Sequence, residues 1–362
     1  MGIALACAGA LALLASVAVI PAVIRISHWR KWYDVPNDRK IHTGPIPRLG
    51  GIGMFVAFLV GAAAVPLLLP VARPAAWPVS YDWRYAPVFA AFCIIHALGL
   101  VDDFRPLRAL FKFLLQIAAA ALVTVGGFGI TSFWIPGFGE HSLGVFAWPA
   151  TVLWIVGISN AINLVDGIDG LAGGITGFTA LTLGIVSLLQ GQAVPALFAF
   201  ALLGAVLGFL FFNFPPARIF MGDSGSLLLG FILAVIPLLG APAWTSTVGL
   251  LPVATALTIP IIDTATAIAR RLREKRAIHA PDKEHIHHKL LSLGLRDTSI
   301  LFLVYALSAL FAAAAVVSVI LDRVSGRVSG FVLLTAVWLC SCAGYSILHR
   351  AAKRLKGSLA RD

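Results

Sequence analysis

Long apolar stretches fill most of this chain and limit its fold more than any other feature. A helix needs roughly 20 apolar residues to cross a bilayer. Windows near that length cover residues 2–24, 50–70, 85–101, 107–126, 145–163, 171–190, 194–212, 226–241, 247–268, 299–320 and 330–349. Because 59% of the 362 residues are hydrophobic and 12% are charged, a water-soluble globule is excluded. The sequence predicts an all-α integral membrane protein, with about eleven transmembrane helices in one polytopic domain over residues 1–362.

The positions of Lys and Arg predict how the chain is oriented. Residues 1–20 contain neither, whereas Arg25, Arg30 and Lys31 follow the first apolar window, which argues against a cleaved signal peptide. If basic loops stay in the cytoplasm, the N-terminus lies outside and the C-terminus is cytoplasmic. All but four of the 27 Lys and Arg then fall on the cytoplasmic side. The net charge of +11 follows this bias, so no nucleic-acid partner is expected.

Polar residues concentrate in the segments that this orientation places in the cytoplasm. We expect catalytic loops at residues 25–49, 102–112, 163–172, 213–226 and 269–298. The outward segment 127–144 is rich in Gly and aromatic residues, which favours a small hairpin at the membrane interface. The four cysteines lie inside apolar windows without metal-binding spacing, so we expect them in the core.

Adjacent carboxylates, Asp102 and Asp103, close the third apolar window. Successive helical residues diverge by roughly 100°, so both cannot be buried in the same apolar wall. At least one should face a polar site, unless the pair only marks a solvated helix end.

A ladder of polar residues follows the fifth window: Asn160, Asn163, Asp166 and Asp169, at steps of three. Such residues are neighbours on a helix surface, and the glycines beyond position 166 allow the backbone to turn. A helix cap with a turn is the alternative, but it explains only one or two of the four.

The segment from Asn213 to Ser226 contains Asp223 between Gly222 and Gly225. Carboxylate and amide oxygens, together with waters and phosphate oxygens, suit the six-coordinate shell of Mg²⁺. A capped turn between two spans remains the alternative reading of this segment.

The histidines of the 269–298 segment, His285, His287 and His288, lack the cysteines and spacing typical of a zinc site. A grip on phosphate oxygens fits them better, because cationic donors pair with oxyanions. Asp263 and His96 lie deeper in apolar windows. Polar packing inside the bundle is the favoured interpretation for His96, whereas for Asp263 packing and a functional role stay equally open.

Four blocks together resemble the polyprenyl-phosphate N-acetylhexosamine-1-phosphate transferase family over nearly the whole chain. They are residues 38–51, 99–104 with 112–116, 160–170, and 213–226. The block 282–288 resembles the bacterial branch that uses UDP-N-acetylglucosamine (UDP-GlcNAc) and feeds O-antigen, enterobacterial common antigen, teichoic acid or arabinogalactan linkage. Ile286 interrupts the run of three histidines typical of the muramyl-pentapeptide branch.

The resemblance implies a role for each matched residue. Asn163 and Asp223 would ligate Mg²⁺, with Mn²⁺ as the alternative metal, and Asp102 and Asp103 would lie at the lipid phosphate and metal. The substrate phosphates would contact Lys112 and Lys40. The uridine would contact Asp169, Asn213 and Phe220. The diphosphate or sugar would face His285, His287 and His288. We also assign Asn160 and Asp166 to substrate binding. Whether Asp102 or Asp103 acts as a base, a covalent nucleophile or an orienting group stays open, with orientation favoured.

The expected reaction is transfer of GlcNAc-1-phosphate from UDP-GlcNAc to undecaprenyl phosphate at the cytoplasmic face of the bacterial inner membrane. The expected partners are these two substrates and the lipid bilayer, and a homodimer is left open. Another UDP-N-acetylhexosamine or UDP-MurNAc-pentapeptide is the alternative donor. A secondary transporter is a more distant alternative, because its ionisable residues would lie near the bilayer midplane.

Overall fold

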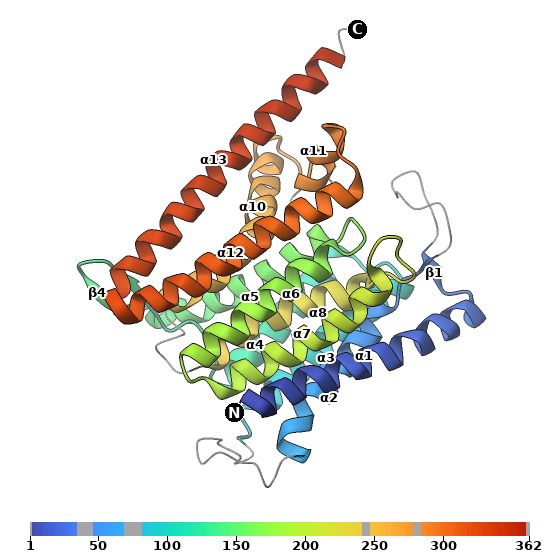
Figure 1. The fold of residues 1–362 in the computed structure, drawn as a ribbon, viewed down its shortest axis with the longest axis horizontal. Helices are drawn as coiled ribbons and strands as arrows, with labels where there is room; N and C mark the ends of the chain where they lie inside the picture. The colour runs from blue at the N-terminus through green and yellow to red at the C-terminus, as the bar shows by residue number, and fades with distance from the viewer. Residues whose placement is uncertain (1, 35–45, 69–81, 241–246, 278–283, 360–362) are drawn as a thin grey trace.

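The computed structural model describes residues 2–34, 46–68, 82–240, 247–277 and 284–359, most of which are helical (Figure 1). The α-helices are α1 (Gly2–Arg30), α2 (Gly50–Leu68), α3 (Tyr85–Phe104), α4 (Ala109–Val125), α5 (Ala147–Val165), α6 (Leu171–Leu189), α7 (Ala193–Asn213), α8 (Gly222–Val235), α9 (Thr247–Ala256), α10 (Thr258–Arg273), α11 (Ile286–Ser292), α12 (Asp297–Ser325) and α13 (Arg327–Leu359). Short 3₁₀ helices, η1 (Gly144–Phe146) and η2 (Ile236–Leu239), precede α5 and follow α8.

Every predicted apolar window coincides with a helix or a helix pair. Within the described ranges, eight helices are long and apolar enough to cross a membrane: α1, α3, α5, α6, α7, α8 with η2, α12 and α13. The pair α9–α10 bends by 81° and could form a ninth span, while α2 and α4 are shorter apolar helices. The all-α membrane architecture is confirmed. The number eleven and the side on which each terminus lies stay predictions.

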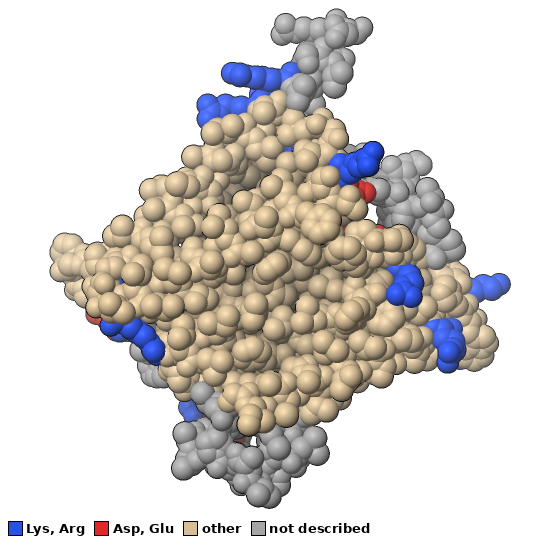
Figure 2. All heavy atoms as spheres, viewed as in Figure 1, with Lys and Arg blue, Asp and Glu red and all other residues tan. Residues whose placement is uncertain are grey.

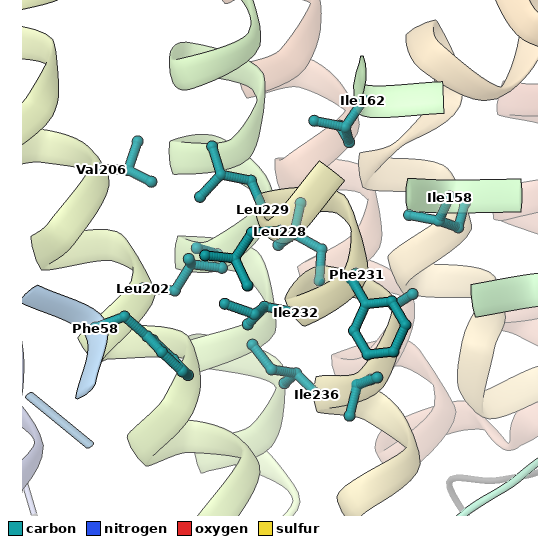
Figure 3. Close-up of a cluster of buried hydrophobic side chains, with 14 of the residues drawn as sticks. Phe58, Ile158, Ile162, Leu202, Val206, Leu228, Leu229, Phe231, Ile232 and Ile236 are labelled. Atoms are coloured by element: carbon teal, nitrogen blue, oxygen red, sulfur yellow. The ribbon is translucent and has the colours of Figure 1, made fainter. Parts of the chain in front are cut away.

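The short helix α8 lies at the centre of the bundle. Of the 18 residues from Gly222 to Leu239, 89% are buried. Figure 3 shows its side chains Leu228, Phe231 and Ile232 packed among Phe58 and Leu202 from neighbouring helices. A helix that is apolar on all sides must be enclosed. This enclosure fixes the position of the helix N-terminus, where Asp223 lies.

The outer helices contrast with this core. Only 6% of the α13 window is buried, and α13 extends along α12 and beyond the bundle (Figure 1). The expected burial of the cysteines is wrong for Cys93, Cys340 and Cys342, which are exposed, while Cys7 is half-buried. Lipid tails are as apolar as a protein interior, so a small apolar residue gains little from turning inward in a membrane helix.

Charged residues lie toward the ends of the molecule. Figure 2 shows Lys and Arg near the C-terminal ends of α1 and α13 and at the opposite end near β4, with an uncharged surface between them. A chain embedded in a bilayer needs such an uncharged band.

Two small antiparallel hairpins complete the fold. Strands β3 (Ser132–Ile135) and β4 (Gly139–Ser142) pair within the segment 127–144, which confirms the predicted hairpin. Strands β1 (Tyr33–Asp34) and β2 (Ile46–Pro47) pair just before α2.

A glycine permits the contact that joins α3 to the start of α8. A Cβ atom built on Gly99 would lie 2.5 Å from the carbonyl carbon of Asp223 and from the Cα of Ser224. These are backbone atoms and cannot rotate away, so the two helices approach this closely only because residue 99 has no side chain.

We expect Gly99→Ala to separate α3 from the start of α8. Overpacking of this kind costs about 1–3 kcal/mol, so the thermal unfolding midpoint in detergent should fall. The matched control is Gly157→Ala in α5, where no atom within 4 Å would meet the new Cβ. Equal midpoints for the two variants would contradict this packing.

Candidate active site

The C-terminal end of α3, the first turns of α4 and the N-terminus of α8 meet at a lysine. Lys112 Nζ lies 2.9 Å from Asp102 Oδ2 and 3.0 Å from Asp223 Oδ2. Two carboxylates this close would otherwise repel each other, so the ammonium group holds them together. An ammonium has three hydrogens to donate, which leaves one for a further oxygen.

Asp103 caps α8. Its Oδ1 accepts a hydrogen bond from the backbone N–H of Asp223 at 2.8 Å, and its Oδ2 accepts one from Ser224 at 3.1 Å. Arg48 Nη2 lies 3.4 Å from Asp103 Oδ1, and the Asp103 side chain is only 1% exposed. The first N–H groups of a helix lack partners within the helix, so Asp103 supplies them from another span and thereby positions Asp223.

Asp102 points in a different direction from Asp103, as the helical geometry predicts. Its Oδ1 accepts a hydrogen bond from the N–H of Leu107 at 2.7 Å, and its Oδ2 faces Lys112. Asp102 therefore closes the turn between α3 and α4 on one side and faces the lysine bridge on the other.

Asn163 and Asp223 form the oxygen-donor pair predicted for a metal. Asn163 Nδ2 donates to Ser226 Oγ at 2.8 Å and to Asp223 Oδ1 at 3.3 Å. Both amide hydrogens are thus directed into the protein, and no described residue bonds Asn163 Oδ1. The Asp223 carboxylate and the Asn163 amide oxygen are hard donors of the kind that suits Mg²⁺, which is usually held by one or two carboxylates plus waters and phosphates.

The described part of the chain contains no cluster of side chains that could by itself enclose a metal ion. No three His, Cys, Asp or Glu residues there are grouped so as to hold a metal ion.

The turns after α5 and α7 are tied to each other by the polar residues predicted to bind substrate. Asn213, 4% exposed, accepts from the N–H of Gly170 at 2.9 Å and donates to the carbonyl of Ile219 at 2.8 Å. Asp169 Oδ2 accepts from the N–H of Ala217 at 2.9 Å. These side chains hold the two turns in register, and their contact with a uridine stays a prediction.

The remaining members of the ladder diverge. Asn160 donates to Gln116 Oε1 of α4 at 2.5 Å and to the carbonyl of Val156 at 2.8 Å, so its amide group joins α5 to α4. Asp166 faces the other carboxylates. Asp166 is exposed at the surface, yet desolvation of its carboxyl group by the surrounding protein, followed by the charges of Asp223, Asp103 and Asp169, raises the pKa of Asp166 to about 7.

The histidines reach the site through His287. A Cβ atom on Gly167 would lie 2.6 Å from His287 Nε2, so α11 packs against the turn after α5. Burial, followed by the charge of His288, lowers the pKa of His287 to about 4. This pKa favours an uncharged imidazole at neutral pH, and contact of His287 with the diphosphate or sugar stays a prediction. A neutral imidazole can still donate one hydrogen bond.

Two predicted substrate contacts, Lys40 and Phe220, are not tested by the structure. Lys40 lies outside the described residues. Phe220 joins two blocks through its backbone: its N–H donates to the carbonyl of Pro47 at 2.7 Å, and its carbonyl accepts from the N–H of Gly50 at 2.9 Å. The role of either residue in substrate binding stays a prediction.

Comparison with known proteins identifies the family. Residues 85–241 match the family described as "Glycosyl transferase family 4". Over 306 residues the chain is 36% identical to the "Probable undecaprenyl-phosphate N-acetylglucosaminyl 1-phosphate transferase" of Bacillus subtilis (strain 168), covering 84% of this chain and 82% of that protein. The chain belongs to the polyprenyl-phosphate N-acetylhexosamine-1-phosphate transferases of glycosyl transferase family 4.

Two other relatives agree with this assignment. The "Decaprenyl-phosphate N-acetylglucosaminephosphotransferase" of Mycobacterium tuberculosis (strain ATCC 25618 / H37Rv) is 34% identical over 292 residues, which are 75% of this chain and 71% of that protein. The "Undecaprenyl-phosphate alpha-N-acetylglucosaminyl 1-phosphate transferase" of Escherichia coli (strain K12) is 28% identical over 341 residues, or 91% and 88% of the two chains. The protein is a phosphoglycosyl transferase, and it is a multi-pass membrane protein.

The sequence analysis did not single out two residues that contact the candidate site. Gln116 follows Lys112 by four residues and is a lone amide in an apolar helix. That spacing puts the two side chains on one helix face, and it was a signal that could have identified Gln116. Arg48, whose Nη2 also donates to the Asp102 carbonyl at 3.3 Å, carried no such signal, because basic residues are expected in any cytoplasmic loop.

We expect Asp103→Asn to destabilise the transferase, because an amide offers one acceptor oxygen to two N–H donors. Hydrogen bonds to charged groups contribute about 1.5–3 kcal/mol, so the unfolding midpoint should fall and turnover with it. The control is Asp82→Asn, which changes a carboxylate paired with Arg84 near the surface. It should leave the unfolding midpoint and the turnover unchanged. An unaltered midpoint for Asp103→Asn would rule out the capping role.

A second prediction concerns pH. In the unfolded chain Asp166 loses its proton near pH 4, whereas the folded protein retains the proton up to about pH 7. The stability that this group contributes is therefore lost as pH rises between these values. In EDTA, the unfolding midpoint of Asp166→Asn should decline less between pH 5 and 8 than that of the unaltered transferase. Parallel pH profiles for the two proteins would refute the shift.

Proposed function

We propose that this transferase moves GlcNAc-1-phosphate from UDP-GlcNAc to undecaprenyl phosphate, releases UMP, and so starts lipid-linked glycan synthesis. The observation that carries the proposal is Lys112 between Asp102 and Asp223, with the Asn163 amide group bonded to Asp223 through Nδ2 and its Oδ1 bonded by no described residue. This arrangement combines a cation for phosphate oxygens with a hard oxygen site for a divalent metal.

The reaction joins two anions. A phosphate oxygen of the lipid attacks the β-phosphorus of UDP-GlcNAc, a new P–O bond forms, the bond from that phosphorus to the bridging oxygen breaks, and UMP leaves with the electron pair. Mg²⁺, when bound, would neutralise phosphate charge and orient the reacting groups. Asn163 and Asp223 would hold the metal. Lys112 would contribute its third N–H to a phosphate oxygen.

The hydrogen bonds of Asp102 and Asp103 support orientation over covalent catalysis. Both oxygens of Asp103 accept backbone N–H groups, and both oxygens of Asp102 are engaged by Leu107 and Lys112. The attacking lipid phosphate is already ionised near neutral pH, so alignment matters more than proton removal.

Two arguments favour GlcNAc as the transferred sugar. The curated relatives named above carry N-acetylglucosamine in their names, and Ile286 interrupts the histidine run typical of the muramyl-pentapeptide branch. The Lys and Arg bias supports a site that faces the cytoplasm, where nucleotide sugars are found. A different UDP-N-acetylhexosamine or UDP-MurNAc-pentapeptide is the runner-up donor.

The purified protein should release UMP from radiolabelled UDP-GlcNAc only when undecaprenyl phosphate is present. EDTA should stop the reaction, and added Mg²⁺ should restore it, with Mn²⁺ tested in parallel. Asp223→Ala should lower turnover by at least about 100-fold, since it removes the carboxylate predicted to bind the metal. Its unfolding midpoint serves as the control for folding.

Three outcomes would overturn the proposal. They are activity with UDP-MurNAc-pentapeptide alone, turnover that EDTA leaves untouched, and full turnover by a folded Asp223→Ala variant. The first would replace the donor, and the other two would remove the metal site.

A further inference from the structure

Asp263 is a buried carboxylate in α10 that the proposed reaction does not use. Its side chain is 1% exposed, and an unpaired charge at such a position costs several kcal/mol. Both of its oxygens bond residues at the N-terminus of α11, the next helix in the sequence. Oδ2 lies 2.8 Å from His285 Nδ1, and Oδ1 accepts from the N–H of Ile286 at 2.8 Å.

This contact fixes the imidazole of His285. An ionised carboxylate can only accept hydrogen bonds, so Nδ1 of His285 carries the proton that Asp263 Oδ2 accepts. The other ring nitrogen, Nε2, is bonded by no described residue. The hydrogen bond at Nδ1 therefore determines whether Nε2 carries a proton when a ligand approaches.

His285 is also the first ring in a row that leads to the active site. The His285 and His287 rings are parallel within 6°, with centroids 6.0 Å apart, and the His287 and His288 rings are 4.3 Å apart. His287 in turn packs against Gly167, in the turn that carries Asp166. Asp263 thus holds the ring that lies next to His287, the histidine that borders the turn after α5.

We propose that Asp263 is a positioning residue that acts through His285, holding Nδ1 so that Nε2 is available to the nucleotide-sugar donor. This inference rests on the proposed function and extends it to a residue outside the catalytic loops. A purely structural role for Asp263 would need only the bond to the N–H of Ile286, which an amide oxygen could also accept. The bond to His285 needs a second acceptor, and that requires the carboxylate.

A double-mutant cycle on the full-length protein separates the two roles. Asp263→Asn keeps the side-chain shape and one oxygen for the Ile286 N–H but removes the acceptor for His285. For metal-ligating histidines, loss of the group that orients the ring typically lowers affinity or activity about 10- to 100-fold. We expect this loss in Asp263→Asn, and we expect the double variant with His285→Gln to be no less active than His285→Gln alone, because one residue acts through the other.

Asp322→Asn in α12 is the matched control, because the same chemical change affects a carboxylate that accepts from the N–H of Gly330 at 3.2 Å, away from the histidines. Its turnover should equal that of the unaltered protein. Full activity of Asp263→Asn, or losses that multiply in the double variant, would overturn the proposal.

A measurement on the unaltered protein keeps the proposal testable if Asp263→Asn does not fold. In protein labelled with ¹⁵N-histidine, the His285 signal, assigned by its disappearance in His285→Gln, should report a protonated Nδ1. An unprotonated Nδ1 would overturn the inference. This readout does not depend on turnover, so it is distinct from failure of the proposed function, in which the unaltered protein would release no UMP from UDP-GlcNAc.

Discussion

The N-terminus of α8, enclosed in the middle of the bundle, is the constraint on which the site depends. The N–H groups of Asp223 and Ser224 have no helical partners, and water cannot freely serve them at that position. Asp103 accepts both hydrogen bonds from a different span. The same contact sets the position of Asp223, and through Lys112 it sets the spacing of Asp223 from Asp102. The cap of α8 and the proposed catalytic residues therefore share one pair of helices.

Close backbone approach makes this arrangement feasible. Gly99 permits α3 to touch the first turn of α8, and Gly222, with a positive φ of 67°, lets the chain turn into α8 beside the Asp103 carboxylate. An alanine at position 99 would place a carbon in the space that the Asp223 backbone occupies. Small residues in membrane helices commonly serve such contacts, because packing replaces the hydrophobic effect as the force between spans.

Around this centre, polar side chains connect turns that are distant in sequence. Asn213 and Asp169 join the turns after α5 and α7, and Tyr305 of α12 donates to the carbonyl of Gly170 at 2.8 Å. Both the N–H and the carbonyl of Gly170 are thus hydrogen-bonded to side chains of other helices. Asp263 fixes α11 in a similar way. Several residues expected only to touch substrate also hold the loops that form the site, because a binding surface built from loops must itself be rigid.

The sequence by itself determined the helical membrane architecture, the family and the polar segments that form the site, because apolar length, charge bias and motif order are local properties of a chain. It also indicated the hairpin at 132–142 and the divergence of Asp102 from Asp103. Only the tertiary structure decided what each polar group does. In the folded chain Asp103 caps α8, and Asn160 donates to Gln116. His287 is a buried ring, and Asp263 bonds His285. Each of these roles depends on an atom far away in the sequence. A side chain's charge and function follow from its neighbours in space, and those are set only when the helices pack.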